Sequence, residues 1–80
     1  MHESLLVREL LEEVFGLARR EAIANITKIR VNTGKDSHIS PESLRFHFEQ
    51  ETQGSPAEES AFEIQATTGA SLFLVSLDGE

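Results

Sequence analysis

The sequence lacks cysteine, tryptophan and tyrosine, so its aromatic content is limited to five phenylalanines in 80 residues. Without cysteine, neither disulfide bonds nor thiolate-bound zinc can stabilise the fold. A chain of this length forms one domain, and it buries only about 60% of the surface that its unfolded state exposes. The packing of apolar side chains must therefore hold the domain together.

Basic residues are also scarce: the chain has 7 basic and 14 acidic side chains, which gives a formal net charge of -7. Proteins bind nucleic acids mainly by neutralising phosphates with lysine and arginine, so this balance argues against a nucleic-acid partner. No apolar run approaches the roughly 20 residues of a membrane helix, and no basic-then-apolar leader is present. We therefore expect a cytoplasmic protein that binds neither nucleic acid nor membrane.

The first predicted element is an amphipathic helix over residues 4–20. Apolar side chains recur there at intervals of three or four, namely Leu6, Leu10, Leu11, Val14, Leu17 and Ala18. Ser4 suits the N-cap position, and Arg19 and Arg20 suit the negative end of the helix dipole. One face of this helix is expected to pack against the rest of the domain.

A strand and a second helix are predicted next. Residues 25–34 alternate, which favours a strand whose covered face carries Thr27, Ile29, Val31 and Thr33. The helix begins with Ser40 as N-cap and Pro41 at its first position, and Leu44 and Phe48 lie one turn apart on it.

Two further strands, 61–66 and 71–78, are predicted on either side of a turn at Gly69, and we expect them to form a hairpin. A strand, a helix and a strand in one domain favour a right-handed crossover, so the first two strands should run parallel. The predicted fold is α+β: a single domain over residues 1–80 in the order α-β-α-β-β. It has a three-stranded mixed sheet with two helices on one face.

The strand 71–78 is nearly continuously apolar, so its side chains cannot all face one core. One interpretation makes it a central strand whose second face is partly covered. The other places Phe73 and Val75 in a homodimer or partner interface through strand 71–78, because contiguous apolar patches on small domains tend to mark contacts. The sequence leaves both open.

The chain opens with Met1, His2 and Glu3, which could chelate a metal ion. The α-amine of Met1, the amide nitrogen of His2 and its imidazole Nδ1 can close two fused chelate rings. Glu3 could add its amide nitrogen or a carboxylate oxygen. Planar nitrogen and oxygen donors suit Ni(II) or Cu(II). A bulky second residue usually prevents removal of the initiator methionine, so the chelate should survive in the cell. The alternative is that His2 is simply an exposed side chain.

Four stretches together resemble the HypA/HybF family of nickel–iron hydrogenase nickel-insertion proteins. They are "MHE" at the start, "ITKIRVNTG" after the first helix, "SPESLRFHFEQETQGSPAEESAFEIQ" after that, and "SLFLVSLD" near the end. Residues 1–66 align with the family pattern without a gap, so the resemblance covers most of the chain.

The resemblance implies a nickel-binding domain in which Met1, His2 and Glu3 hold Ni(II). It implies two partners, the nickel-insertion GTPase and the hydrogenase large subunit. Members of the family carry a cysteine zinc domain between the strands that correspond to 61–66 and 71–78. This chain has "TTGA" there, so we expect a short turn near 67–70 in its place and no zinc site.

Three other side chains are candidates for a role in binding. His38, in the loop before the second helix, could be an additional ligand, and His47 on that helix is a weaker candidate. Phe46 is expected to be covered by the loop 52–60 or by strand 71–78, the alternative being a partner contact. The adjacent residues of "DSH" (36–38) do not build a hydrolase triad, which is assembled from separate parts of a fold.

The sequence therefore supports a non-enzymatic, nickel-binding accessory protein for hydrogenase maturation. The competing hypothesis is an adaptor or dimerisation module that keeps the fold, lacks the zinc lobe and does not deliver metal.

Overall fold

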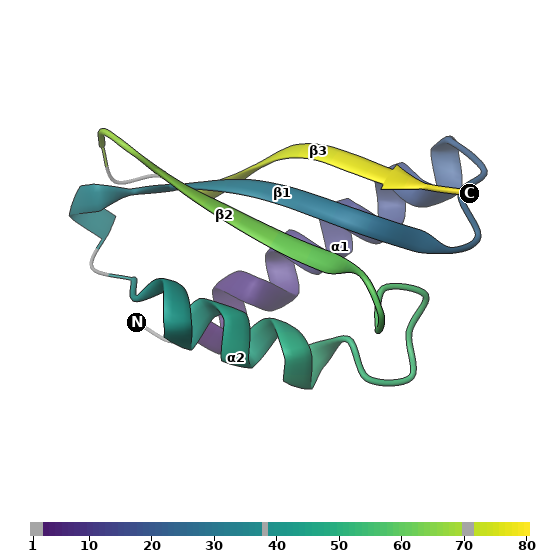
Figure 1. The fold of residues 1–80 in the computed structure, drawn as a ribbon, viewed down its shortest axis with the longest axis horizontal. Helices are drawn as coiled ribbons and strands as arrows, with labels where there is room; N and C mark the ends of the chain where they lie inside the picture. The colour runs from purple at the N-terminus through teal and green to yellow at the C-terminus, as the bar shows by residue number, and fades with distance from the viewer. Residues whose placement is uncertain (1–2, 38, 70–71) are drawn as a thin grey trace.

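A computed structural model describes residues 3–37, 39–69 and 72–80. The chain forms two layers, a three-stranded sheet and a pair of helices that cover one of its faces (Figure 1). The elements in chain order are α1 (Glu3–Arg20), β1 (Ile26–Gly34), the short 3-10 helix η1 (Lys35–Ser37), α2 (Pro41–Glu51), β2 (Ala61–Thr67) and β3 (Leu72–Gly79). The predicted α+β fold, with a mixed sheet and both helices on one face, is confirmed.

The order of the strands is β2-β1-β3, so β1 is the central strand. β2 runs parallel to β1 through the crossover that contains α2, as expected, whereas β3 pairs antiparallel with β1. The predicted hairpin between the second and third strands is therefore wrong, and so is the interpretation that the third strand is central. The connection after β2 passes the end of β1 instead of turning back, and the amide of Asp36 donates to the carbonyl of Gly69 there at 2.9 Å.

α1 supplies five of the buried apolar side chains, Val7, Leu10, Leu11, Val14 and Ala18. The buried stripe is centred one position away from the predicted one, because Val7 replaces Leu6 at its start and Leu17 is only half-buried. The helix begins at Glu3, so Ser4 lies inside its first turn and is not the predicted N-cap.

The inner face of β1 carries Ile26, Ile29, Val31 and Thr33, all buried. Thr27 was predicted on this face but is exposed, because the pairing with β3 shifts register between Ile26 and Lys28 and this irregularity breaks the alternation. The rest of the strand alternates as the sequence predicts.

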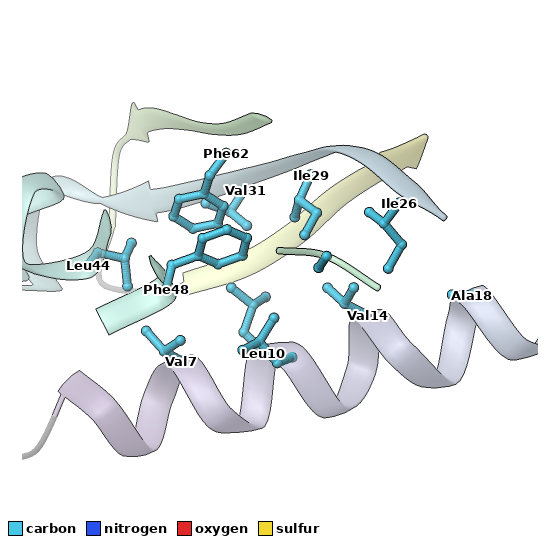
Figure 2. Close-up of a cluster of buried hydrophobic side chains, with 12 residues drawn as sticks. Val7, Leu10, Val14, Ala18, Ile26, Ile29, Val31, Leu44, Phe48 and Phe62 are labelled. Atoms are coloured by element: carbon cyan, nitrogen blue, oxygen red, sulfur yellow. The ribbon is translucent and has the colours of Figure 1, made fainter. Parts of the chain in front are cut away.

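A capping residue determines where α2 begins, and buried side chains in its middle attach it to the core. Ser40 caps it, since the backbone N–H of Ser43 donates to the Ser40 hydroxyl oxygen at 3.4 Å, and Pro41 occupies the first turn. Leu44 and Phe48 are buried, and the ring of Phe48 stacks on that of Phe62 in β2 with centroids 3.9 Å apart. Figure 2 shows these side chains between α1 and the sheet.

Four large apolar side chains are exposed among the described residues, namely Leu5, Phe46, Phe73 and Val75. Phe46 is 57% exposed, so the expectation that a loop or strand covers it is wrong; α2 turns it away from the core. In β3, Leu72, Leu74 and Leu77 pack against the core, whereas Phe73 is 47% and Val75 51% exposed on the opposite face.

Two glycines provide a matched test of this packing. A Cβ built on Gly79 would lie 2.5 Å from the carbonyl oxygen of Asn25, whereas one built on Gly16 in α1 has nothing within 4 Å. We expect Gly79→Ala to lower the free energy of unfolding by about 1–3 kcal/mol through overpacking. Gly16→Ala should raise it by about 0.5–1 kcal/mol through helix propensity. Urea unfolding followed by far-UV circular dichroism measures both, and a neutral Gly79→Ala would contradict the close approach of the end of β3 to Asn25.

Candidate metal centre

The three residues predicted to bind nickel lie at the start of the chain, where α1 begins. Glu3 is the first residue of α1. Met1 and His2 lie outside the described residues, and so does His38. Their arrangement around an ion therefore stays a prediction, and the structure contributes the surroundings of the first turn of α1.

The first half of α1 lies against α2. Val7 and Leu44 belong to the same buried cluster, and Figure 2 shows Val7 on the side of α1 that faces α2. Nearby, Nε of Arg8 donates to a carboxylate oxygen of Glu51 at 3.2 Å. This exposed ion pair contributes at most about 1 kcal/mol, so the buried side chains provide most of the attachment. The start of α1 is thereby held beside α2, in the helical layer.

His47 is the histidine that the described part of the chain contains. It is half-buried on α2, and its ring meets that of Phe46 edge-on, with centroids 5.5 Å apart and an interplanar angle of 72°. Since residues four apart share one side of a helix, His47 lies on the same flank as Glu51, which reaches α1 through Arg8. From the sequence, His47 is the weaker ligand candidate, because helical spacing alone does not show which flank of α2 faces α1.

Within residues 3–37, 39–69 and 72–80, no group of three or more histidine, cysteine, aspartate or glutamate side chains is placed to hold a metal ion. None of the helices in the described ranges is long and apolar enough to cross a membrane. The predicted donors of Met1 and His2 lie outside these ranges, so the N-terminal site stays a prediction from the sequence.

The acidic charge is concentrated outside the sheet. The three strands carry two basic residues, Lys28 and Arg30, and two acidic ones, Glu63 and Asp78, so the remainder of the chain has the whole net charge of -7. Glu63 pairs with both bases, at 3.0 Å from Nε of Arg30 and 3.5 Å from Nζ of Lys28. The two helices carry seven acidic and four basic residues, a net charge of -3, and the connections and the chain end carry the other -4.

The chain is thus a small α+β domain in which the first helix, α1, directly follows the predicted nickel ligands and packs on α2. Residues 1–71 match the family described as hydrogenase/urease nickel incorporation, metallochaperone, HypA. The chain belongs to this family, and the resemblance seen in its motifs is confirmed.

Similar sequences carry the name of hydrogenase maturation factor HypA. The protein from Dechloromonas aromatica is 39% identical over 70 residues, which are 88% of this chain and 62% of that protein. The protein from Methanopyrus kandleri is 33% identical over 69 residues, 86% of this chain and 49% of that protein. The chain thus spans about half to three-fifths of the length of these relatives.

Two solved structures share the fold. The nickel metallochaperone HypA from Helicobacter pylori superposes with a TM-score of 0.75 at 17% identity, over 95% of this chain and 72% of that one. A second structure of a HypA protein gives a TM-score of 0.82 at 16% identity, over 100% of this chain and 97% of that one. At these identities the likeness establishes the fold.

His47 provides a test of where the ligands lie. The predicted donor set of Met1, His2 and Glu3 is complete without it, so His47→Gln should change the dissociation constant for Ni(II) by less than about threefold. His2→Ala should weaken binding at least about tenfold. Calorimetric titration of each variant measures both constants. If His47→Gln weakened nickel binding more than His2→Ala, the nickel site would lie on α2 and not at the N-terminus.

Proposed function

We propose that this protein is a cytoplasmic, non-enzymatic accessory protein of nickel–iron hydrogenase maturation that holds Ni(II) at its N-terminus through Met1, His2 and Glu3. The observation that carries the proposal is family membership: residues 1–71 match a family of nickel-incorporation metallochaperones, and the match includes the opening Met-His-Glu. The relatives named as hydrogenase maturation factors support the choice of target enzyme.

The chemistry of the donors favours nickel in a planar site. The α-amine, the amide nitrogen and the imidazole Nδ1 belong to two adjacent residues and close a five-membered and a six-membered chelate ring that share the amide nitrogen. These fused rings restrict the three donors to nearly one plane. Glu3 supplies the fourth donor. Such a nitrogen-rich set suits Ni(II) or Cu(II), and the intrinsic affinity order favours copper. The selection of nickel therefore depends on supply or on a delivery partner.

The start of α1 explains how the domain would present this site. Because Glu3 already lies in the helix, the ligands directly precede a rigid element that is packed on α2 through Val7. The remainder of the domain then provides the surface that binds the maturation GTPase or the hydrogenase large subunit. This chain has no cysteine, so the proposed function involves no zinc bound to thiolates. Residues 1–80 act as one domain with a short connection near 67–70.

The alternative is an adaptor that keeps the fold but does not deliver metal. Two observations favour it: this chain spans 62% of the D. aromatica relative, and its 80 residues contain no cysteine. The two functions differ in whether the N-terminus binds nickel.

We expect the native chain to bind one equivalent of Ni(II) with a micromolar or tighter dissociation constant. Adding one glycine before Met1 should weaken binding at least about tenfold, because it moves the free amine away from the imidazole and breaks the fused rings. Isothermal titration calorimetry of both proteins measures the effect.

The added glycine should leave the far-UV circular dichroism spectrum and the urea midpoint unchanged, which separates loss of the ligand from loss of the fold. Equal nickel affinity in the two proteins, or no binding in either, would refute the N-terminal site and favour the adaptor.

A further inference from the structure

The face of the sheet opposite the helices is uncovered in the described structure (Figure 1). Alternate residues of β1 and β2 point towards it, because their neighbours Ile29, Val31 and Phe62 are buried on the inner face. A hollow of about 580 Å³ lies on the β2 side of this face, and we call it the edge hollow. Its walls include two arginines and two side-chain amides, namely Arg30, Arg45, Asn32 and Gln65.

Arg45 reaches the edge hollow from α2, at the free edge of β2. This strand pairs with β1 on one side only, since the strand order is β2-β1-β3. Nη1 of Arg45 donates to the backbone carbonyl of Phe62 at 2.7 Å, and the guanidinium carbon lies 5.9 Å from the centroid of the Phe62 ring. These contacts position the guanidinium without neutralising it, because a carbonyl and an aromatic ring carry no net charge. Glu49 and Glu58 line a second hollow beside Arg45, yet no ion pair within the described ranges includes Arg45.

Arg30, the other arginine of the edge hollow, shares one carboxylate with a lysine. Glu63 accepts from Nε of Arg30 at 3.0 Å and lies 3.5 Å from Nζ of Lys28. With Arg45, these side chains bring three positive charges and one negative charge together, a sum of +2 in a chain whose net charge is -7. A guanidinium has several N–H donors, and one of them is used by each arginine within the described residues. The remaining donors are available to an anionic ligand.

We propose that the edge hollow binds a small dicarboxylate, with one carboxylate on Arg45 and the other on Arg30. Two carboxylates balance the charge of these side chains, and a guanidinium matches a carboxylate through two parallel N–H···O bonds. Asn32 and Gln65 are partners in the parallel register, and their amides add N–H donors for the same oxygens. This site goes beyond the proposed nickel function and uses none of the nickel ligands.

The volume of the hollow and the edge of β2 both favour a small molecule over a peptide. The volume lies within the range of roughly 300–1,000 Å³ that is common for small-molecule sites. An extended peptide would bind by pairing with the outward backbone groups of β2. Arg45 already occupies one of these groups, the carbonyl of Phe62, so it blocks such pairing at this end of the strand.

Val75 gives the edge hollow an apolar wall. This side chain of β3 is 51% exposed and lines the hollow together with the polar residues. The hydrocarbon that joins two carboxylates would cover part of Val75 and remove apolar surface from water. Succinate, in which two methylene groups join the carboxylates, is therefore a suitable probe.

A ligand held by both arginines would join the helical layer to the sheet, because Arg45 belongs to α2 and Arg30 to β1. A ligand that binds only the folded chain stabilises it, and the effect grows with ligand concentration. Both arginines are exposed to water, which weakens each ion pair. We therefore expect a dissociation constant on the order of 1 mM.

Titration of the metal-free protein with succinate, followed by nuclear magnetic resonance of the amide groups at constant ionic strength, tests the proposal. Up to about 20 mM succinate should produce saturable shifts at Asn32, Glu63 and Gln65, with a dissociation constant on the order of 1 mM. About 10 mM succinate should raise the midpoint of thermal unfolding by at least about 3 °C. Succinamide, which has the same shape without the charges, should produce neither effect.

Variants of the two arginines locate the site. Arg45→Gln and Arg30→Gln should each weaken succinate binding at least about fivefold. The matched control is Arg20→Gln at the end of α1, an exposed arginine that no ion pair within the described ranges includes. This variant should leave the dissociation constant unchanged within about twofold. Circular dichroism checks that each variant is folded, and either variant of the edge hollow is sufficient for the test.

Three results would overturn the dicarboxylate site. The first is the absence of saturable shifts up to about 20 mM succinate. The second is an equal response to succinamide, which would mean that the carboxylates are not recognised. The third is a loss of binding in Arg20→Gln as large as in Arg45→Gln and Arg30→Gln, which would indicate a nonspecific effect of charge. Since no nickel is present, failure here leaves the metal site untouched.

Discussion

The central strand β1 is the constraint on which the rest of this small structure depends. It pairs with β2 on one side and β3 on the other, and its inner face carries Ile29 and Val31 against the helices. A domain of 80 residues without disulfides has room for one such buried strand. Every other element must therefore cover β1 or extend its sheet, which fixes α1 and α2 on one face.

This arrangement separates the two surfaces to which we assign roles. The start of α1, where nickel is proposed to bind, belongs to the helical layer. The face of the sheet that the helices do not cover lies on the other side of the molecule (Figure 1). The charges follow the same division, since the strands are neutral and the rest of the chain is acidic.

The helices and strands were predicted well because the spacing of apolar residues within each segment reflects the geometry of that segment. Ser40, Pro41, Leu44 and Phe48 predicted α2 correctly through capping and helical spacing. Strand pairing was predicted less well, because alternation shows which side chains share a face but not which strand lies alongside. From the sequence, β3 could either return beside β2 as a hairpin or lie on the other side of β1, and it lies on the other side of β1.

Single residues were misplaced where tertiary contacts override local patterns. Thr27 is exposed because of the irregular pairing of β1 with β3, and Phe46 is exposed because α2 turns it away from the core. The family was predicted correctly from its motifs. The metal ligands Met1 and His2 precede the described residues, so their role remains a prediction.

Nuclear magnetic resonance of the amide groups would test the central claim most directly. On addition of one equivalent of Ni(II), the account predicts that the backbone amide signal of His2 disappears, because this nitrogen loses its proton to the metal. The amide signals of the first turn of α1 should shift, whereas those of Arg30 on β1 and Phe73 on β3 should not. An unchanged His2 signal, with the largest shifts at His47 or elsewhere, would contradict nickel binding at the N-terminus.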